Sequence, residues 1–298
     1  MTESCFCGAK FEIIKRHYGL SEEDFTKHVQ KLYEWLITQP HLPHDVDYIT
    51  LQKFVVNAKF LQDKAEKKLD AYFTVRRLVP YVFSNRDPFC PEIKQCNACI
   101  YLGFLPGLTK SGARCIIIRL RDTNPENFNF ISFLRRWYFL MDIWLREDNF
   151  VHKINIIVDS AESTVRHMVK ISPKKVKESS VCYQNVYPIG LESVVFLNAC
   201  PLVKVVLEKV LKPMLKEKIS RKFFVYADSE ANFIKGMTKS MLPKEYGGDG
   251  PTLEELNDRW IAEMNRNREW LMGQGSILPD ETKRKKDDTS GSSGCILM

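Results

Sequence analysis

The chain contains residue types that act in catalysis, but their order matches none of the common catalytic motifs. It has no G-x-S-x-G nucleophile elbow and no H-E-x-x-H zinc motif. The run Gly107-Leu-Thr-Lys-Ser-Gly112 carries the lysine and hydroxyl of a phosphate-binding loop. The residue immediately before the lysine is not a glycine, however, which favours a surface loop between strands. Asp159 ends a predicted strand as a single carboxylate, and capping the next helix explains it better than catalysis. The sequence therefore indicates a protein that is not an enzyme.

Cysteine and histidine spacing does not predict a metal site. Of the 9 cysteines, Cys5 and Cys7 are separated by one residue, where structural zinc sites usually have two to four. Cys96 and Cys99 lack the βαβ surroundings of a redox motif, and the histidine pair His41 and His44 lies in a predicted loop. We predict buried, reduced thiols, no metal and no cofactor. With no secretory signal and no apolar run of about 18–20 residues, the sequence indicates a cytosolic protein.

Positive charge is concentrated in one part of the chain. The net charge is +7, and the segment from Lys170 to Lys222 alone holds eleven lysines and arginines against four glutamates, an excess of seven. A localised cationic surface attracts nucleic acid, acidic proteins or an anionic membrane. A well-solvated surface is the alternative interpretation.

The first hundred residues have the spacing of helices. Ser21 is placed to cap a helix whose apolar stripe is Phe25, Val29, Leu32 and Leu36. Two more helices are predicted near 48–58 and over 62–78. Residues 1–95 are therefore expected to form a small all-helical N-terminal domain.

From about Cys99, short β-rich runs alternate with helical runs, which predicts an α/β fold with a sheet covered by helices. We expect this domain to span 96–250, followed by a C-terminal amphipathic helix over 251–273 and a disordered tail over 274–298. The expected strands are 100–105, 115–120, 154–158, 193–197 and 223–226. The expected helices start at Asn124-Pro125 and lie near 163–169, from Ser172-Pro173 to 183, and over 201–215.

The C-terminal half carries motifs that resemble the CRAL-TRIO lipid-binding family. They are Tyr187-Pro-Ile-Gly190, Asn198-Ala-Cys-Pro201 and Leu242-Pro-Lys-Glu-Tyr-Gly-Gly248, in order and at matching spacing. The pattern is most similar to the branch with the alpha-tocopherol transfer protein and the retinaldehyde-binding protein. The resemblance implies a mixed sheet, a hydrophobic cavity, a movable gate helix and a helical N-terminal domain.

The gate helix implied by the resemblance is the run from 202 to 211. Lys204, Glu208 and Lys212 fall on one face at i, i+4 and i+8. An ordinary helix that covers a core has the same pattern, and the resemblance favours a gate. The predicted apolar face consists of Val203, Val206, Leu207, Val210 and Leu211.

Helical spacing and strand alternation select candidates for the cavity wall. Their aromatic members favour a narrow cargo such as an isoprenoid or retinoid. Arg136 lies beside the helical stripe, where it either binds a polar head group or faces solvent. The predicted wall residues are Phe133, Trp137, Leu140, Met141, Ile154, Ile156, Val158, Val194 and Phe196.

In the tocopherol-transfer branch a basic cleft binds a phosphoinositide head group. Lys218 and Lys222 match two of its positions, whereas Val56, Ala58 and Gly190 stand where that cleft has basic residues. The remaining basic residues still attract anionic lipid in general, and each basic residue near the membrane surface contributes roughly 1 kcal/mol. The predicted anionic-lipid site comprises Lys216, Lys218, Arg221 and Lys222.

The run Cys295-Ile-Leu-Met298 fits a C-a-a-X signal for farnesylation of Cys295, which would make the chain a farnesyl transferase substrate. An unmodified exposed tail is the alternative. Taken together, we expect a non-catalytic intracellular carrier that binds a small hydrophobic lipid such as a retinoid, tocopherol or isoprenoid. It would exchange this lipid at anionic, phosphoinositide-containing membranes, be peripherally membrane-associated in the cytoplasm, and not bind nucleic acid. The alternative is a membrane-associated, phosphoinositide-binding signalling or scaffold protein.

Overall fold

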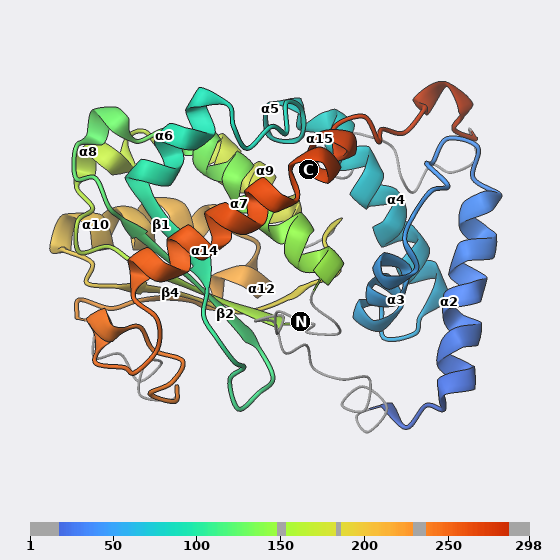
Figure 1. The fold of residues 1–298 in the computed structure, drawn as a ribbon, viewed down its shortest axis with the longest axis horizontal. Helices are drawn as coiled ribbons and strands as arrows, with labels where there is room; N and C mark the ends of the chain where they lie inside the picture. Colours follow the sequence, from blue (N-terminus) through green and yellow to red (C-terminus); the bar gives the residue numbers. More distant parts are fainter. Residues whose placement is uncertain (1–17, 148–152, 183–185, 229–236, 286–298) are drawn as a thin grey trace.

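A computed structural model describes residues 18–147, 153–182, 186–228 and 237–285 of the chain. A layer of helices formed by the N-terminal residues lies on one side of a five-stranded sheet that has its own covering helices (Figure 1). The helices of this layer are α2 (Glu22–Ile37), α3 (Tyr48–Asn57), α4 (Gln62–Leu78) and α5 (Pro80–Phe83). The next helix, α6 (Pro91–Cys99), lies apart from them and packs against β1 and the long helix α7 (Phe130–Glu147).

The N-terminal helices begin and pack as their sequence predicts. The Ser21 side chain accepts a hydrogen bond from the Asp24 N–H at 3.1 Å, which satisfies one of the unpaired donors at the start of α2. All four residues of the predicted stripe, Phe25, Val29, Leu32 and Leu36, are buried in the main core.

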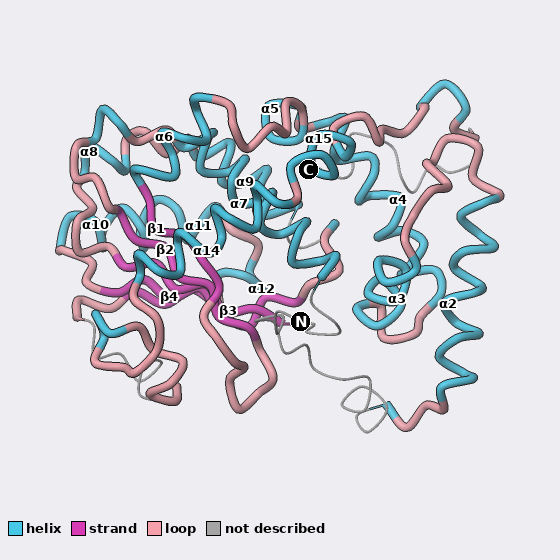
Figure 2. Tube along the Cα trace, in the orientation of Figure 1, coloured by secondary structure: helices cyan, strands magenta, loops and turns pink. Residues whose placement is uncertain are grey.

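The strands, magenta in Figure 2, form one sheet. Its strand order is β1-β2-β3-β4-β5, with β1 and β2 antiparallel and the remaining neighbours parallel. Side chains alternate between its faces: Ile157 and Val195 pack against Leu253 and Leu256, while their neighbours point to the opposite face. The strands are β1 (Ile100–Phe104), β2 (Arg114–Leu120), β3 (Lys153–Asp159), β4 (Gly190–Leu197) and β5 (Phe223–Val225).

The face that carries Ile157 and Val195 is covered in part by α14 (Leu253–Arg266), which crosses close to β1. Gly103 permits this approach, because a Cβ atom there would lie 2.8 Å from the Trp260 ring. After α14 the chain turns at Asn267 into α15 (Arg268–Gln274), so the single C-terminal helix that we expected is two helices.

The opposite face is covered by α7 (Phe130–Glu147), α8 (Val165–Met168), α9 (Pro173–Val181) and the segment Pro201–Met214. Our prediction that the long helix starts at Asn124-Pro125 is wrong. Residues Pro125–Asn127 form a separate 3₁₀ turn, η1, and the Asn129 side chain accepts the N–H groups of Ile131 and Ser132 at 2.9 and 3.0 Å. A second capping side chain close to the first therefore decides where the long helix begins.

The part of the chain that follows α15 differs from the disordered tail that we expected over 274–298. The 3₁₀ turn η5 (Glu281–Lys283) lies against the helical layer, where the Arg284 guanidinium binds both oxygens of Asp70 at 2.7 and 2.9 Å. The Asp280 N–H donates to the His41 carbonyl at 2.8 Å. We call residues 277–284 the C-terminal strap. Residues 286–298, with Cys295, lie outside the described residues.

Candidate functional site

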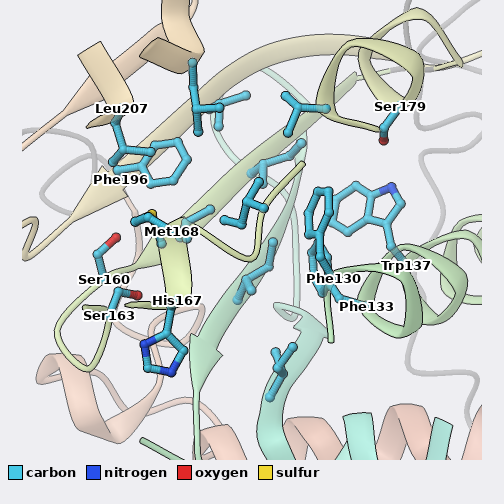
Figure 3. Close-up of a pocket in the computed structure, with 18 of the residues that line it drawn as sticks. Phe130, Phe133, Trp137, Ser160, Ser163, His167, Met168, Ser179, Phe196 and Leu207 are labelled. Atoms are coloured by element: carbon cyan, nitrogen blue, oxygen red, sulfur yellow. The ribbon is translucent and has the colours of Figure 1, made fainter. Parts of the chain in front are cut away.

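A cavity of about 280 Å³ lies between the sheet and the helices α7, α8, α9 and Pro201–Met214 (Figure 3). Its volume is just below the roughly 300–1,000 Å³ of small-molecule pockets. The wall is almost entirely apolar, with contributions from five strands and five helical segments. Its lining residues include Ile118, Phe128, Phe130, Phe133, Leu134, Trp137, Ile156, Val158, Met168, Ile171, Val176, Val194, Phe196, Leu207, Leu211, Leu215, Ile219 and Phe223.

Six of the nine residues predicted for the wall line this cavity. Along α7 the cavity-lining positions are Phe130, Phe133, Leu134 and Trp137, which follow i, i+3, i+4 and i+7. The six predicted residues are Phe133, Trp137, Ile156, Val158, Val194 and Phe196.

The other three predictions are wrong as cavity positions. Leu140 and Met141 are fully buried in the main core and do not border the cavity, whose α7 positions end at Trp137. Ile154 is also fully buried in that core, at the start of β3, where the register with β4 shifts between Ile154 and Asn155.

Arg136 neither faces solvent nor lines the cavity. It is fully buried, and its guanidinium donates to the carbonyls of Ile100 at 2.7 Å and Leu102 at 3.4 Å and to Asn257 Oδ1 at 2.6 Å. Arg136 therefore joins α7, β1 and α14, a structural role that its place beside an apolar stripe did not indicate.

The predicted gate helix is not a uniform α-helix. It consists of α10 (Pro201–Val205), a π-helical segment η3 (Val206–Leu211) and α11 (Lys212–Met214). Val203, Leu207 and Leu211 are buried toward the cavity side, Val206 is half-buried, and Val210 is 46% exposed.

Our placement of Val210 on the inner face is wrong because the i→i+5 bonds of a π-helix widen each turn. The inner positions then follow at steps of four, and Val210 turns outward. The outer face of the segment consequently exposes the apolar side chains of Leu202, Val205 and Val210 at 66%, 55% and 46%.

A group of basic residues follows the segment Pro201–Met214, and the sequence predicted only some of its members. Lys216, Lys218 and Arg221 are exposed, and Arg221 forms an ion pair with Glu217. Lys222 is half-buried, donates to the Leu191 carbonyl, and has its pKa lowered by burial and then by the charge of Lys218.

Lys68 of α4 is a member of this group that sequence reasoning missed. Its ammonium donates to Asn57 Oδ1 at 2.6 Å and to the Tyr187 carbonyl at 3.3 Å. Burial, followed by the nearby charges of Lys64 and Lys218, lowers the pKa of Lys68 to about 8. Only the packing of α4 against the sheet domain brings it there. The charges of Lys64 and Lys218 act on Lys68, and those of Lys218 and Lys153 act on Lys222, where Glu192 opposes them. We call Lys64, Lys68, Lys153, Lys218 and Lys222 the lysine cluster.

Asp159, the carboxylate that sequence analysis singled out, is occupied by structural contacts. Its oxygens accept hydrogen bonds from Tyr246 Oη at 2.6 Å, Asn198 Nδ2 at 2.8 Å and the Ala161 N–H at 3.0 Å, and Arg119 lies 3.3 Å away. The carboxylate therefore connects β3, the end of β4 and the Leu242–Gly248 motif.

The thiols of Cys96 and Cys99 are free and buried, and burial raises the pKa of Cys99 to about 11. Cys5 and Cys7 lie outside the described residues. Within 18–147, 153–182, 186–228 and 237–285, no three His, Cys, Asp or Glu side chains gather as a metal site would require, and no helix is long and apolar enough to cross a membrane.

Known proteins are similar in sequence to this chain over most of its length. The human protein named alpha-tocopherol transfer protein-like is 28% identical over 216 residues, which are 72% of this chain and 62% of that protein, so the chain spans less than two thirds of its length. Clavesin-1 of Xenopus laevis is 23% identical over 243 residues, 80% of this chain and 73% of that protein. The crystal structure of Sfh5 aligns with 80% of this chain and 92% of that chain at 15% identity, with a TM-score of 0.49, too low to add to the assignment.

Family models match both parts of the chain. The model described as Pinta-like, UBA domain matches residues 21–93, which contain the helical layer. The model described as CRAL/TRIO domain matches residues 100–248, which contain the sheet, the cavity and Pro201–Met214. Because this second match covers half of the chain, the protein belongs to the CRAL/TRIO domain family.

Proposed function

We propose that this protein is a non-catalytic carrier that binds one small hydrophobic lipid in its cavity and exchanges it at a membrane. The observation that carries the proposal is the cavity of about 280 Å³, which has an almost wholly apolar wall and is bordered by a segment with apolar residues on both its inner and outer faces. The name of the human relative, alpha-tocopherol transfer protein-like, supports the same class of function.

The cargo that fits best is a single narrow molecule of the retinoid, tocopherol or isoprenoid type. Three rings of α7, those of Phe130, Phe133 and Trp137, border the cavity and narrow it. The volume is also small for a ligand pocket, which favours one slender molecule over a lipid with two acyl chains.

Membrane docking is supported by apolar side chains on the outside of the molecule near the gate. Leu202, Val205 and Val210 are exposed on Pro201–Met214, and Val165 and Val169 are exposed at α8, which contacts α10. Exposed apolar patches of this kind mark interaction surfaces. In our proposal the segment enters the bilayer interface through these side chains and swings its inner face away from the cargo.

The lysine cluster supports a preference for anionic and phosphoinositide-containing membranes. Lys68 of α4 adds a positive charge beside Lys218 and Lys222 of the predicted site. This charge offsets in part the basic residues that are replaced by Val56, Ala58 and Gly190. Each basic residue near an anionic surface contributes roughly 1 kcal/mol.

Farnesylation of Cys295 is a further part of the proposal and rests on the sequence alone. One prenyl chain gives weak and reversible membrane binding, which suits a shuttle. The test compares a Cys295→Ser variant with the wild type after cell fractionation. The same division between cytosol and membrane for both would contradict prenylation.

The central test is mass spectrometry of the small molecules extracted from protein purified from its native tissue. One retinoid, tocopherol or isoprenoid at near-equimolar amount is the expected result. A phospholipid would redirect the function toward phospholipid exchange. A folded protein with an empty cavity would favour the second candidate, a membrane-bound signalling or scaffold protein. Such a protein would need only the lysine cluster, to bind the membrane.

A further inference from the structure

The cavity has one polar end, and its chemistry restricts the cargo beyond its apolar body. Ser160, Ser163 and His167 lie together on one side of the cavity, and the rings of Phe130 and Trp137 lie on the other (Figure 3). The remaining serine of the wall, Ser179, lies apart from this group. The inference below rests on the proposed carrier function and concerns what this end binds.

His167 is the one member of this group with a buried hydrogen-bonding atom left unused. Its side chain is 1% exposed, and among the residues that the structure describes its Nε2 has no hydrogen-bond partner. Buried polar atoms in folded proteins are nearly always paired, so an unpaired one in a cavity wall indicates a partner that enters the cavity.

The other ring nitrogen determines what His167 can offer. Its Nδ1 accepts the N–H of Thr164 at 3.2 Å, at the start of α8, and lies 3.0 Å from the Thr164 hydroxyl, which can donate to it as well. A ring nitrogen that accepts a backbone N–H carries no proton. The proton of the ring is then on Nε2, which makes this atom a donor. Burial, followed by the charge of Lys170, lowers the pKa of His167 and keeps the ring neutral at neutral pH, although Asp122 acts in the opposite direction.

The charges at this end disfavour an acidic cargo. Arg119 is the cation of the wall, and it is engaged by Asp159 at 3.3 Å and by Glu162 at 3.5 Å. Lys170, beyond His167, binds Glu126 at 3.2 Å and the Pro125 carbonyl at 2.6 Å. A carboxylate entering here would meet a neutral donor and the charge of Asp159, with no unpaired cation nearby among the described residues.

We propose that His167 is a specificity-determining residue whose Nε2–H donates to a single uncharged oxygen of the cargo. The cargo is then a neutral oxygenated lipid, an alcohol, ketone, aldehyde or phenol, rather than a hydrocarbon or a fatty acid. A site built to donate one hydrogen bond rejects the analogue that lacks the acceptor, because its own buried donor then stays unpaired.

Three probes with one carbon skeleton test this inference: all-trans-retinol, all-trans-retinoic acid and axerophthene, in which a methyl replaces the hydroxymethyl group of retinol. Binding is followed by quenching of protein tryptophan fluorescence, to which Trp137 in the wall contributes. The wild type is expected to bind retinol at least about fivefold more tightly than either analogue, which is the effect of roughly one hydrogen bond.

The His167→Asn variant separates the two ring nitrogens. An asparagine oxygen can still accept the Thr164 N–H, whereas the donor at the Nε2 position is lost. We expect retinol affinity to fall about five- to tenfold and axerophthene affinity to stay unchanged. The matched control is Ser179→Ala, which removes a hydroxyl from the wall away from His167 and should leave the preference for retinol intact.

The outcomes distinguish this inference from the carrier function on which it rests. Equal binding of the three probes, unaffected by His167→Asn, would overturn the role of His167 and leave the carrier function standing. Tighter binding of retinoic acid than retinol would overturn the neutral-cargo assignment. Failure of the folded wild type to bind any of the three would overturn both the inference and the proposed isoprenoid-type cargo.

Discussion

Asp142 of α7 holds the helical layer to the sheet domain through a buried cluster of ions and hydroxyls. Its carboxylate lies 3.1 Å from Arg76 and 2.7 Å from Arg86, and it accepts the Tyr187 hydroxyl at 2.6 Å. All four side chains are buried. The single negative charge of Asp142 thus lies between two buried guanidinium groups, so its removal would leave both positive charges unpaired.

We predict that Asp142→Asn lowers the free energy of unfolding by about 3–5 kcal/mol, since two buried cations lose their counter-charge. Urea denaturation measures this directly. The control is Glu23→Gln, which removes an exposed ion pair with Lys27 and should change stability by less than about 1 kcal/mol. Equal effects of the two variants would contradict this account of the cluster.

Lys68 makes membrane binding depend on pH if the lysine cluster binds anionic lipid. The pKa of Lys68 is lowered to about 8, so its charge is present below that pH and lost as the pH rises through it. We predict weaker co-sedimentation with phosphatidylserine vesicles at pH 9 than at pH 7, with a smaller difference in Lys68→Met. A Lys218→Glu, Lys222→Glu double variant should bind weakly at both values. The same pH dependence in wild type and Lys68→Met would exclude Lys68 as its cause.

Titration of Lys68 also affects folding. Because the folded state lowers this pKa from 10.5, the unfolded chain holds the proton more tightly, and the contribution of Lys68 to stability rises between about pH 8 and 10.5.

At the scale of elements, the segment Pro201–Met214 has apolar side chains on two faces, one toward the cavity and one toward the outside. Leu207 and Leu211 border the cavity, whereas Val205 and Val210 face outward. Sequence periodicity cannot make this division, since an α-helical wheel assumes the α-helical turn throughout and the π-helical part of the segment has a wider turn.

Val205→Asp is predicted to reduce binding to anionic vesicles several-fold while leaving the amount of bound lipid unchanged. The reason is that a charge on the outer face opposes entry into the membrane interface without touching the cavity. Met272→Asp is the matched control, at a position of α15 that is 46% exposed and outside the lysine cluster. Loss of bound lipid in Val205→Asp would show that the two faces are not independent.

The C-terminal strap is a second element with a defined energetic role. Arg284 is 11% exposed, and its guanidinium binds Asp70, the Thr74 hydroxyl at 2.9 Å and Glu281. Arg284→Ala is predicted to cost about 1–3 kcal/mol of stability. It should also speed amide hydrogen exchange in α4, whereas Lys283→Ala, at an exposed ion pair with Asp280, should do neither. Unchanged exchange in α4 would mean that the strap does not stabilise it.

For the whole molecule, local patterns predicted the elements better than the contacts between them. The helix over 62–78 and the strand cores were predictable because their apolar periodicity is continuous. The start of α7 was not, because the side chains of Asn124 and Asn129 both accept backbone N–H groups, and the sequence does not show which of the two begins the long helix.

In the candidate site, too, local patterns predicted some residues, whereas residues that depend on contacts between elements were not predicted. Ile156, Val194 and Phe196 were predictable as cavity residues from strand alternation and the family resemblance. Lys68 was not, because its role depends on an interface between the helical layer and the sheet domain. His167 was not either, because an unpaired nitrogen has no signature in the sequence.

The central claim is that the cavity is the binding site of the carrier. The most direct measurement is the amount of lipid bound per protein after incubation with vesicles containing retinol, α-tocopherol and squalene, for the wild type and for Val194→Trp, which fills the cavity. Leu61→Trp adds the same ring at an exposed site. The account predicts near-equimolar lipid in the wild type and Leu61→Trp, and almost none in a folded Val194→Trp. Equal lipid in all three proteins would contradict it.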